Sequence, residues 1–183
     1  CKNLFNKFIN CKINRGKGYA CRQGIKKATG EIIIIQDGDL EYNPKNYPRL
    51  IKPIKNNKFK IVYGSRVLDG AKRTRPKTIS FAIRIFANHF LTYLSNLINN
   101  QNLTDAHTCY KVFSSKIIKD INLQEDGFNF CPEVTTKVAK LNLKITEVPI
   151  DYYGRTISEG KKIQFFDGFR AIYCLIKYKF FSE

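Results

Sequence analysis

Two aspartates separated by one glycine, Asp37 and Asp39, follow four consecutive isoleucines in the segment IIIIQDGDLEYNP at residues 32–44. In an extended chain the side chains of residues i, i+2 and i+4 lie on one side, so Glu41 is expected to join both aspartates in one acidic cup. Gly38 lets the backbone bend tightly there. Hard cations such as Mg²⁺ or Mn²⁺ bind carboxylates together with substrate phosphate oxygens. The segment predicts a divalent-metal site, and a simple turn after a strand is the alternative.

The acidic segment lies in a strongly basic chain. There are 32 Lys and Arg residues against 15 Asp and Glu, which gives a formal net charge of +17. Such a surface attracts phosphates in nucleotides, nucleic acid or anionic lipid, and charge alone does not choose among them. A bound divalent ion would reconcile the local negative charge with a phosphorylated substrate.

A second candidate site is the segment NRGKGYACRQG at residues 14–24. It places Gly16 and Lys17 at the start of an expected helix, where free backbone N–H groups and the helix dipole favour an anion. The Walker pattern G-x-x-x-x-G-K-[ST] is absent, and G-x-G by itself usually indicates only a tight turn. Both readings, a phosphate site and a turn, therefore stay open.

Expected helices and strands alternate along the chain, which predicts one compact α/β domain with a mostly parallel sheet flanked by helices. The expected helices lie at residues 17–28, 44–56, 79–98, 132–142 and 163–181, with a further short helix capped by Ser114 or Ser115. The expected strands lie at residues 31–37, 59–65, 109–113 and 143–153. Open α/β sheets bind ligands at the carboxyl ends of their strands, and this is where the two aspartates are expected to lie.

The remaining composition restricts the class of protein. The chain has no methionine and begins at Cys1, so we expect that its natural N-terminus is missing. Its six cysteines form no C-x-x-C pair, which argues against zinc and a dense disulfide framework and fits a reducing cytosol. No run reaches the roughly 18 to 20 apolar residues of a membrane span. Residues 79–98 and 163–181 mix apolar, aromatic and basic residues, as in packed core helices or membrane contacts.

Five stretches, taken in their order along the chain, resemble one protein family. They are NRGKGYACRQGIKKATGEIIIIQDGDLEY, GSR (64–66), TDAHTCYKVF (104–113), GFNFCPEVTTKVAK (127–140) and EVPIDYYGRTISEGKKI (147–163). The chain resembles the family 2 glycosyltransferases, and within them the dolichyl-phosphate mannosyltransferases and related polyprenyl-phosphate sugar transferases. The resemblance implies a GT-A-type, Rossmann-like fold. It also implies a single catalytic domain over residues 1–183, with the family's first strand upstream and an amphipathic C-terminal helix at about 163–182.

The resemblance implies roles for particular residues. Asp37 and Asp39 match the D-x-D motif that holds Mg²⁺ or Mn²⁺ against the donor diphosphate, and Asp39 is also a candidate catalytic residue. Arg155 matches the basic residue of a late arginine motif that binds phosphate, and the match extends to Arg66 after its strand. Lys161 is a further candidate for phosphate binding. Many relatives have alanine between the aspartates and serine before that lysine, so donor identity and the details of phosphate binding stay open.

The implied reaction is metal-dependent, inverting transfer of a hexose from GDP-mannose or a UDP-sugar to polyprenyl or dolichyl phosphate. The enzyme would act while bound peripherally to an anionic membrane on its cytoplasmic face. A phosphate oxygen is largely ionised near neutral pH because its second pKa is about 6, so it needs positioning more than a base. The candidates for holding this phosphate are Arg66, Arg155 and Lys161.

Two alternatives belong to other classes. A hydroxyl acceptor on a glycan would need a general base, and Asp105 and Glu133, which match acidic positions near the family's acceptor side, are the candidates. A non-catalytic basic module that binds RNA or a membrane is the second alternative. The chain has no recognisable RNA-binding signature, so we do not expect nucleic acid as a partner.

Overall fold

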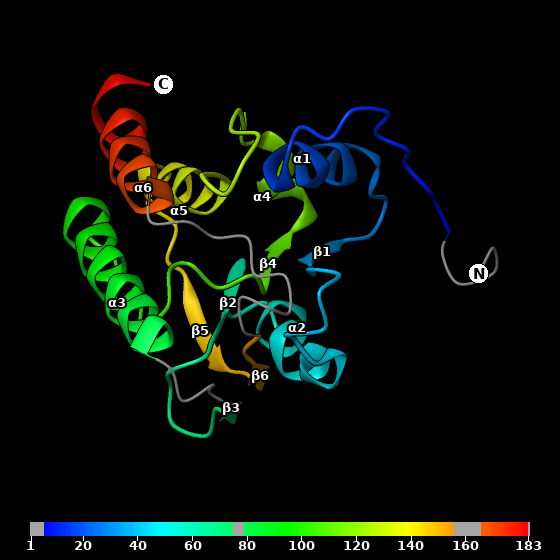
Figure 1. Ribbon diagram of the computed structural model, residues 1–183. Helices are drawn as coiled ribbons and strands as arrows, with labels where there is room; N and C mark the ends of the chain where they lie inside the picture. Colours follow the sequence, from blue (N-terminus) through cyan, green and yellow to red (C-terminus); the bar gives the residue numbers. More distant parts are fainter. Residues whose placement is uncertain (1–5, 75–78, 156–165, 183) are drawn as a thin grey trace.

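The computed structural model describes residues 6–74, 79–155 and 166–182, and its centre is a four-stranded mixed sheet in the order β1-β4-β2-β5 (Figure 1). These strands are β1 (Ile32–Ile35), β2 (Ile61–Ser65), β4 (Lys111–Ser114) and β5 (Thr146–Pro149). β4 is antiparallel to both neighbours, and β2 is parallel to β5. A separate parallel pair is formed by β3 (Arg73–Thr74) and β6 (Tyr152–Tyr153).

The sheet was expected to be mostly parallel, and β4 is the reason that it is mixed. The loop between helix α3 (Ile79–Asn99) and β4 brings the chain to the end of the sheet at which β2 ends. Gly64 near the end of β2 donates its N–H to the carbonyl of Tyr110, just before β4, at 2.8 Å. β4 therefore starts beside the end of β2 and runs back along it, with Tyr63 opposite Lys111.

The helices have the expected order and nearly the expected bounds. They are α1 (Lys17–Lys27), η1 (Pro44–Asn46), α2 (Tyr47–Lys55), α3 (Ile79–Asn99), α4 (Ser115–Asp120), α5 (Phe130–Lys140), α6 (Phe166–Ile176) and the π-helical turn η2 (Lys177–Phe181). α3, α5 and α6 pack against one another, whereas α2 packs against β2 and β4 (Figure 1). In the part of the chain that the structure describes, no helix combines the length and apolar character needed to cross a bilayer.

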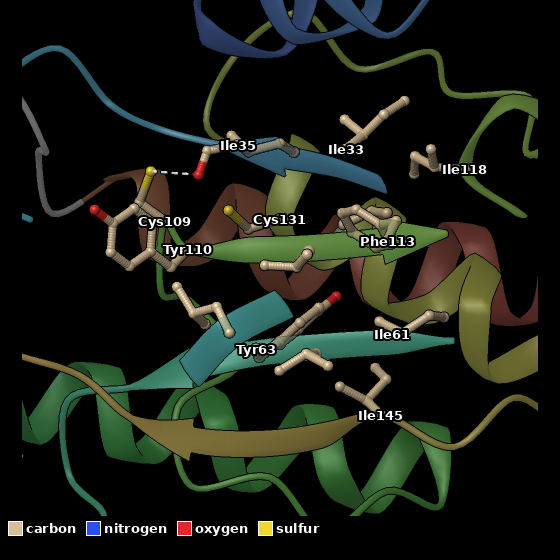
Figure 2. Packing of buried hydrophobic residues seen from close by; sticks show 14 of the residues in the cluster. Ile33, Ile35, Ile61, Tyr63, Cys109, Tyr110, Phe113, Ile118, Cys131 and Ile145 are labelled. Atoms are coloured by element: carbon tan, nitrogen blue, oxygen red, sulfur yellow. Dashed lines mark hydrogen bonds between the residues drawn. The ribbon is translucent and has the colours of Figure 1, made fainter. Parts of the chain in front are cut away.

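The hydrophobic core explains why so apolar a strand precedes the aspartates. All five residues of β2 are buried, and in β1 Ile33 and Ile35 are buried while Ile32 and Ile34 pack against the core from partly buried positions. Figure 2 shows Ile33 and Ile35 of β1 on one side of β4, and Ile61 and Tyr63 of β2 on the other side. The core thus fixes the strand from which the acidic loop emerges, so the loop starts at a defined point of the sheet edge.

Candidate active site

The loop that carries Asp37 and Asp39 leaves the carboxyl end of β1, as predicted, and its first aspartate is held from two sides. The Asp37 N–H donates to Sγ of Cys109 at 3.1 Å, and the Cys109 thiol lies beside the carbonyl of Ile35 (Figure 2). The Lys17 ammonium, from the first turn of α1, donates to Oδ2 of Asp37 at 2.8 Å. The Asp37 side chain is 28% exposed, so it faces solvent while paired with one cation.

Asp39 has a different basic partner. Nη2 of Arg155, just after β6, donates to Oδ2 of Asp39 at 2.9 Å. The other carboxylate oxygen of Asp39 accepts the backbone N–H of Glu41 at 3.1 Å, which folds the loop back on itself. The Asp39 side chain is 25% exposed. The D-x-D motif and the late arginine, 116 residues apart in sequence, are therefore in direct contact.

Glu41 does not join the two aspartates, and the expected three-carboxylate cup is not formed. Leu40 has a positive φ of 61°, so the chain is bent here and the alternation of an extended strand is lost. Glu41 is only 7% exposed and accepts hydrogen bonds from the Tyr152 hydroxyl and the Arg155 backbone N–H, each at 2.9 Å. Within residues 6–74, 79–155 and 166–182, no three His, Cys, Asp or Glu side chains are grouped to hold a metal. Glu41 instead positions Arg155.

The two remaining carboxylates still fit the kind of ion that the sequence predicts. Mg²⁺ in substrate complexes is usually held by one or two carboxylates together with substrate phosphates and water, not by a full protein cage. Asp37 and Asp39 are partly exposed, and each carries one monovalent counter-charge. Their chemistry suits an ion that arrives with a diphosphate.

Arg66 and Asp105, which were considered for separate roles, form a buried ion pair. Nε and Nη2 of Arg66 donate to the two carboxylate oxygens of Asp105 at 2.6 and 2.7 Å, and the Arg66 N–H adds a third bond at 3.2 Å. Asn88 on α3 donates to the same carboxylate at 3.2 Å. Burial alone would raise the pKa of Asp105, but the Arg66 charge and these hydrogen bonds lower it to about 2. A carboxylate in this state is a weak base.

The loop before β4 is fixed by Glu147 on β5, a residue that the sequence analysis did not single out. One carboxylate oxygen of Glu147 accepts the N–H and hydroxyl of Thr104 at 2.7 and 2.9 Å, and the other accepts the Asp105 N–H at 2.9 Å. The signal was present in the EVP stretch, where an acidic residue lies inside an expected strand. Glu147 therefore sets the position from which Asp105 meets Arg66.

Glu133, the second candidate base, is fully buried in α5. It accepts the backbone N–H groups of Gln124 and Glu125 at 2.6 and 2.9 Å and pairs with Lys137 at 2.9 Å. Both oxygens are thus used to attach the loop before α5 to that helix. Such a contact stabilises the fold, since a buried carboxylate needs partners for its charge.

The start of α1 offers fewer free N–H groups than expected. The N–H groups of Gly18 and Tyr19 donate to the carbonyls of Gly127 and Asp126 at 3.2 and 3.0 Å, and that of Gly16 donates to the Asn14 side chain. The glycines permit this close approach, because a Cβ on Gly18 would lie 2.2 Å from the carbonyl oxygen of Glu125. The contribution of this segment to the site is therefore the side chain of Lys17 rather than an open helix N-terminus.

The tertiary structure links most of the candidate residues through Tyr152, to which the sequence analysis gave no role. Tyr152 donates to Glu41, which holds Arg155, and the Arg66 guanidinium carbon lies 5.1 Å from the Tyr152 ring centroid. This contact joins the acidic loop to the Arg66–Asp105 pair. Lys161 lies outside the described residues.

Comparison with known proteins identifies the family. Residues 2–121 match the family described as glycosyl transferase family 2, and the chain belongs to that family. An α/β fold of the GT-A type, predicted from the resemblance, is confirmed: the chain superposes on glucosyl-3-phosphoglycerate synthase from Mycobacterium tuberculosis, solved with Mn²⁺ and uridine-diphosphate-glucose, with a TM-score of 0.61. That match covers 90% of this chain and 54% of the synthase chain at 14% identity, so it shows the fold alone.

Two curated relatives are named for sugar transfer to polyprenyl phosphates. The chain is 27% identical to a UDP-N-acetylglucosamine--dolichyl-phosphate N-acetylglucosaminyltransferase of Methanococcus voltae, over 91% of this chain and 66% of the relative. It is 28% identical to the undecaprenyl-phosphate mannosyltransferase of Micrococcus luteus, over 72% of this chain and 53% of the relative. The chain thus spans between about half and two thirds of the length of these relatives.

Proposed function

We propose that this chain belongs to the catalytic domain of an enzyme that transfers a hexose, with inversion, from a nucleotide sugar to a polyprenyl or dolichyl phosphate. The observation that carries the proposal is the state of the two candidate bases. Asp105 pairs with Arg66, and Glu133 pairs with Lys137. Neither carboxylate is exposed to solvent. An acceptor whose attacking oxygen is already ionised needs no base, and a lipid phosphate is such an acceptor.

Asp37 and Asp39 would hold a divalent ion, Mg²⁺ or Mn²⁺, which when bound stabilises the negative charge that develops on the departing nucleotide diphosphate. Support comes from their partial exposure at the end of β1 and from the Mn²⁺ in the solved structure of similar fold. Lys17 and Arg155 neutralise these carboxylates in the free protein. Both cations are positioned to turn to phosphate oxygens when the aspartates take another ligand.

The proposed acceptor is a membrane lipid. Undecaprenyl and dolichyl phosphates, named in the two relatives, are lipids, so the domain must meet its acceptor at a bilayer surface. We therefore propose that the protein works peripherally on the cytoplasmic face of a membrane. GDP-mannose and UDP-sugars are the candidate donors.

The test is a radiolabelled-sugar transfer assay on the full-length protein with a panel of donors. Polyprenyl phosphate and the corresponding free polyprenol are supplied as acceptors, with Mn²⁺ or with a chelator. We expect transfer to the phosphate only, dependent on the metal, with a rate that rises as pH increases through about 6, where the phosphate loses its second proton. Asp39→Asn should abolish transfer and the exposed Asp69→Asn should not. Transfer to polyprenol, or to neither acceptor with any donor, would refute the proposal.

A further inference from the structure

Two neighbouring helices each expose a stripe of large apolar side chains, which we call the α3–α6 face. On α3 the spacing alternates between four and three residues in Ile79, Ile83, Phe86, Phe90, Tyr93 and Leu97, which are 48–82% exposed. On α6 and η2 the stripe is formed by Phe166, Phe169, Tyr173, Ile176 and Phe180, which are 40–69% exposed. This spacing keeps each set on one side of its helix. α3 and α6 contact each other and lie side by side (Figure 1).

From Thr92 onward the polarity of α3 is the reverse of that of a helix that faces water, whereas Phe81 in its first turns is buried. Its buried side carries polar residues: Thr92, Ser95 and Asn99 are at most 3% exposed. Asn99 donates to the hydroxyl of Thr136 on α5 at 3.2 Å, and Thr92 accepts the Ala106 N–H at 3.3 Å. A helix at a protein–water boundary normally buries its apolar side and exposes its polar side. α3 is therefore suited to an apolar environment on its outer side.

The charges on these helices indicate which environment this is. α3 contains Arg84 and has no Asp or Glu, and α6 with η2 contains Arg170, Lys177 and Lys179 against Asp167 alone. The Arg170 side chain is 71% exposed and lies 3.5 Å from Asp167, and Lys177 pairs with Glu125 at 3.1 Å. A second copy of the chain would bring the same positive charges together, whereas an anionic bilayer surface complements them. Phenylalanine and tyrosine side chains beside basic residues are typical of helices that lie in the plane of the headgroup layer.

We propose that the α3–α6 face is the surface by which this domain binds an anionic lipid bilayer, with both helices lying in the interface. The inference extends the proposed function, because a domain docked in this way meets a lipid-phosphate acceptor at the membrane surface. The apolar stripes enter the boundary between headgroups and acyl chains, and the basic side chains remain among the lipid phosphates.

The experiment measures co-sedimentation of the full-length protein with vesicles of phosphatidylcholine, with or without phosphatidylglycerol. Phe86→Ser combined with Tyr93→Ser tests α3, and Phe169→Ser combined with Tyr173→Ser tests α6. The matched control is Phe8→Ser, since Phe8 is 75% exposed and lies outside the face. We expect binding to the anionic vesicles, weakened at least about tenfold by either double substitution and unchanged by the control. Because all four residues are exposed, each variant should keep the wild-type thermal transition.

Three results would overturn the inference: no binding of the wild-type protein to anionic vesicles, binding that both double variants retain, or a wild-type dimer that the double variants dissociate without any vesicle binding. The last result would assign the face to a second copy. Sugar transfer to a short, water-soluble prenyl phosphate separates this inference from the proposed function. Retained transfer with lost vesicle binding supports both. Vesicle binding without transfer by the wild type refutes only the acceptor, and leaves the docking surface supported.

Discussion

Replacing Asp105 with asparagine tests whether this carboxylate stabilises the fold instead of acting as a base. The side chain is fully buried and accepts two hydrogen bonds from the Arg66 guanidinium, at 2.6 and 2.7 Å. The substitution leaves the Arg66 guanidinium, whose side chain is only 12% exposed, opposite a neutral amide. Removing one charge of a buried pair costs about 3–5 kcal/mol. Since a typical domain is stable by only about 5–15 kcal/mol, this loss is a large part of the free energy of unfolding.

The pH dependence of the free energy of unfolding gives a second magnitude for the contribution of Asp105. The pKa of Asp105 falls from its ordinary 3.8 to about 2 in the folded protein, because Arg66 and its hydrogen bonds outweigh the effect of burial. The folded pKa is the lower one, so the carboxylate stabilises the fold fully above about pH 4, and its contribution of about 2 kcal/mol is lost between about pH 4 and 2. Burial also lowers the pKa of His107, to about 4. Protonation of His107 therefore lowers stability in both proteins as the pH falls from about 6.5 to 4, and this loss is larger in Asp105→Asn because the Asp105 charge raises the His107 pKa in the wild type.

The assay is urea unfolding of the wild-type protein and Asp105→Asn at pH 7 and at lower pH. The difference between the two should be about 3–5 kcal/mol at pH 7 and should shrink below about pH 4. The control is Asp120→Asn at the exposed end of α4, which should change stability by less than about 0.5 kcal/mol. A variant as stable as the wild type that nevertheless loses sugar transfer by orders of magnitude would refute this reasoning. Asp105 would then act in the chemistry, and a hydroxyl acceptor would be favoured.

Three further substitutions test other parts of the site. Gly18→Ala should destabilise the fold strongly in thermal unfolding because its Cβ would meet the Glu125 carbonyl oxygen, whereas Gly24→Ala, with no atom within 4 Å, should be neutral or stabilise by up to about 1 kcal/mol. Arg155→Gln should raise the affinity of the free protein for Mn²⁺ about two- to fivefold in titration calorimetry, since a partly exposed ion pair contributes up to about 1 kcal/mol. Sugar transfer by this variant should fall. Unchanged Mn²⁺ affinity would contradict the pairing of Arg155 with Asp39. Glu41→Gln should lower the free energy of unfolding by about 1–3 kcal/mol in urea, because it weakens the hydrogen bonds that Glu41 accepts from Tyr152 and Arg155. An unchanged urea midpoint would show that these hydrogen bonds do not stabilise the loop.

Local features of the chain were readable without coordinates. The isoleucine run predicts a buried strand, because four apolar β-branched residues fit a sheet covered on both faces, and the two aspartates directly after it must lie at its carboxyl end. Pro44 marks a helical start in the same way, because its fixed φ suits the first turn. These predictions depend on neighbouring residues only, and the structure reproduces them.

Contacts between distant segments were decided by the tertiary structure. The hydrogen bond between Asp39 and Arg155 joins residues 116 apart in sequence, and the one between Arg66 and Asp105 joins residues 39 apart. The direction of β4 and the orientation of Glu41 depend likewise on how the chain returns to the sheet and on one bent residue, Leu40. The same carboxylate side chain can bind a metal, accept a proton or pair with an arginine. Which of these it does depends on the partners and the exposure that folding gives it, and residue spacing along the chain does not encode these.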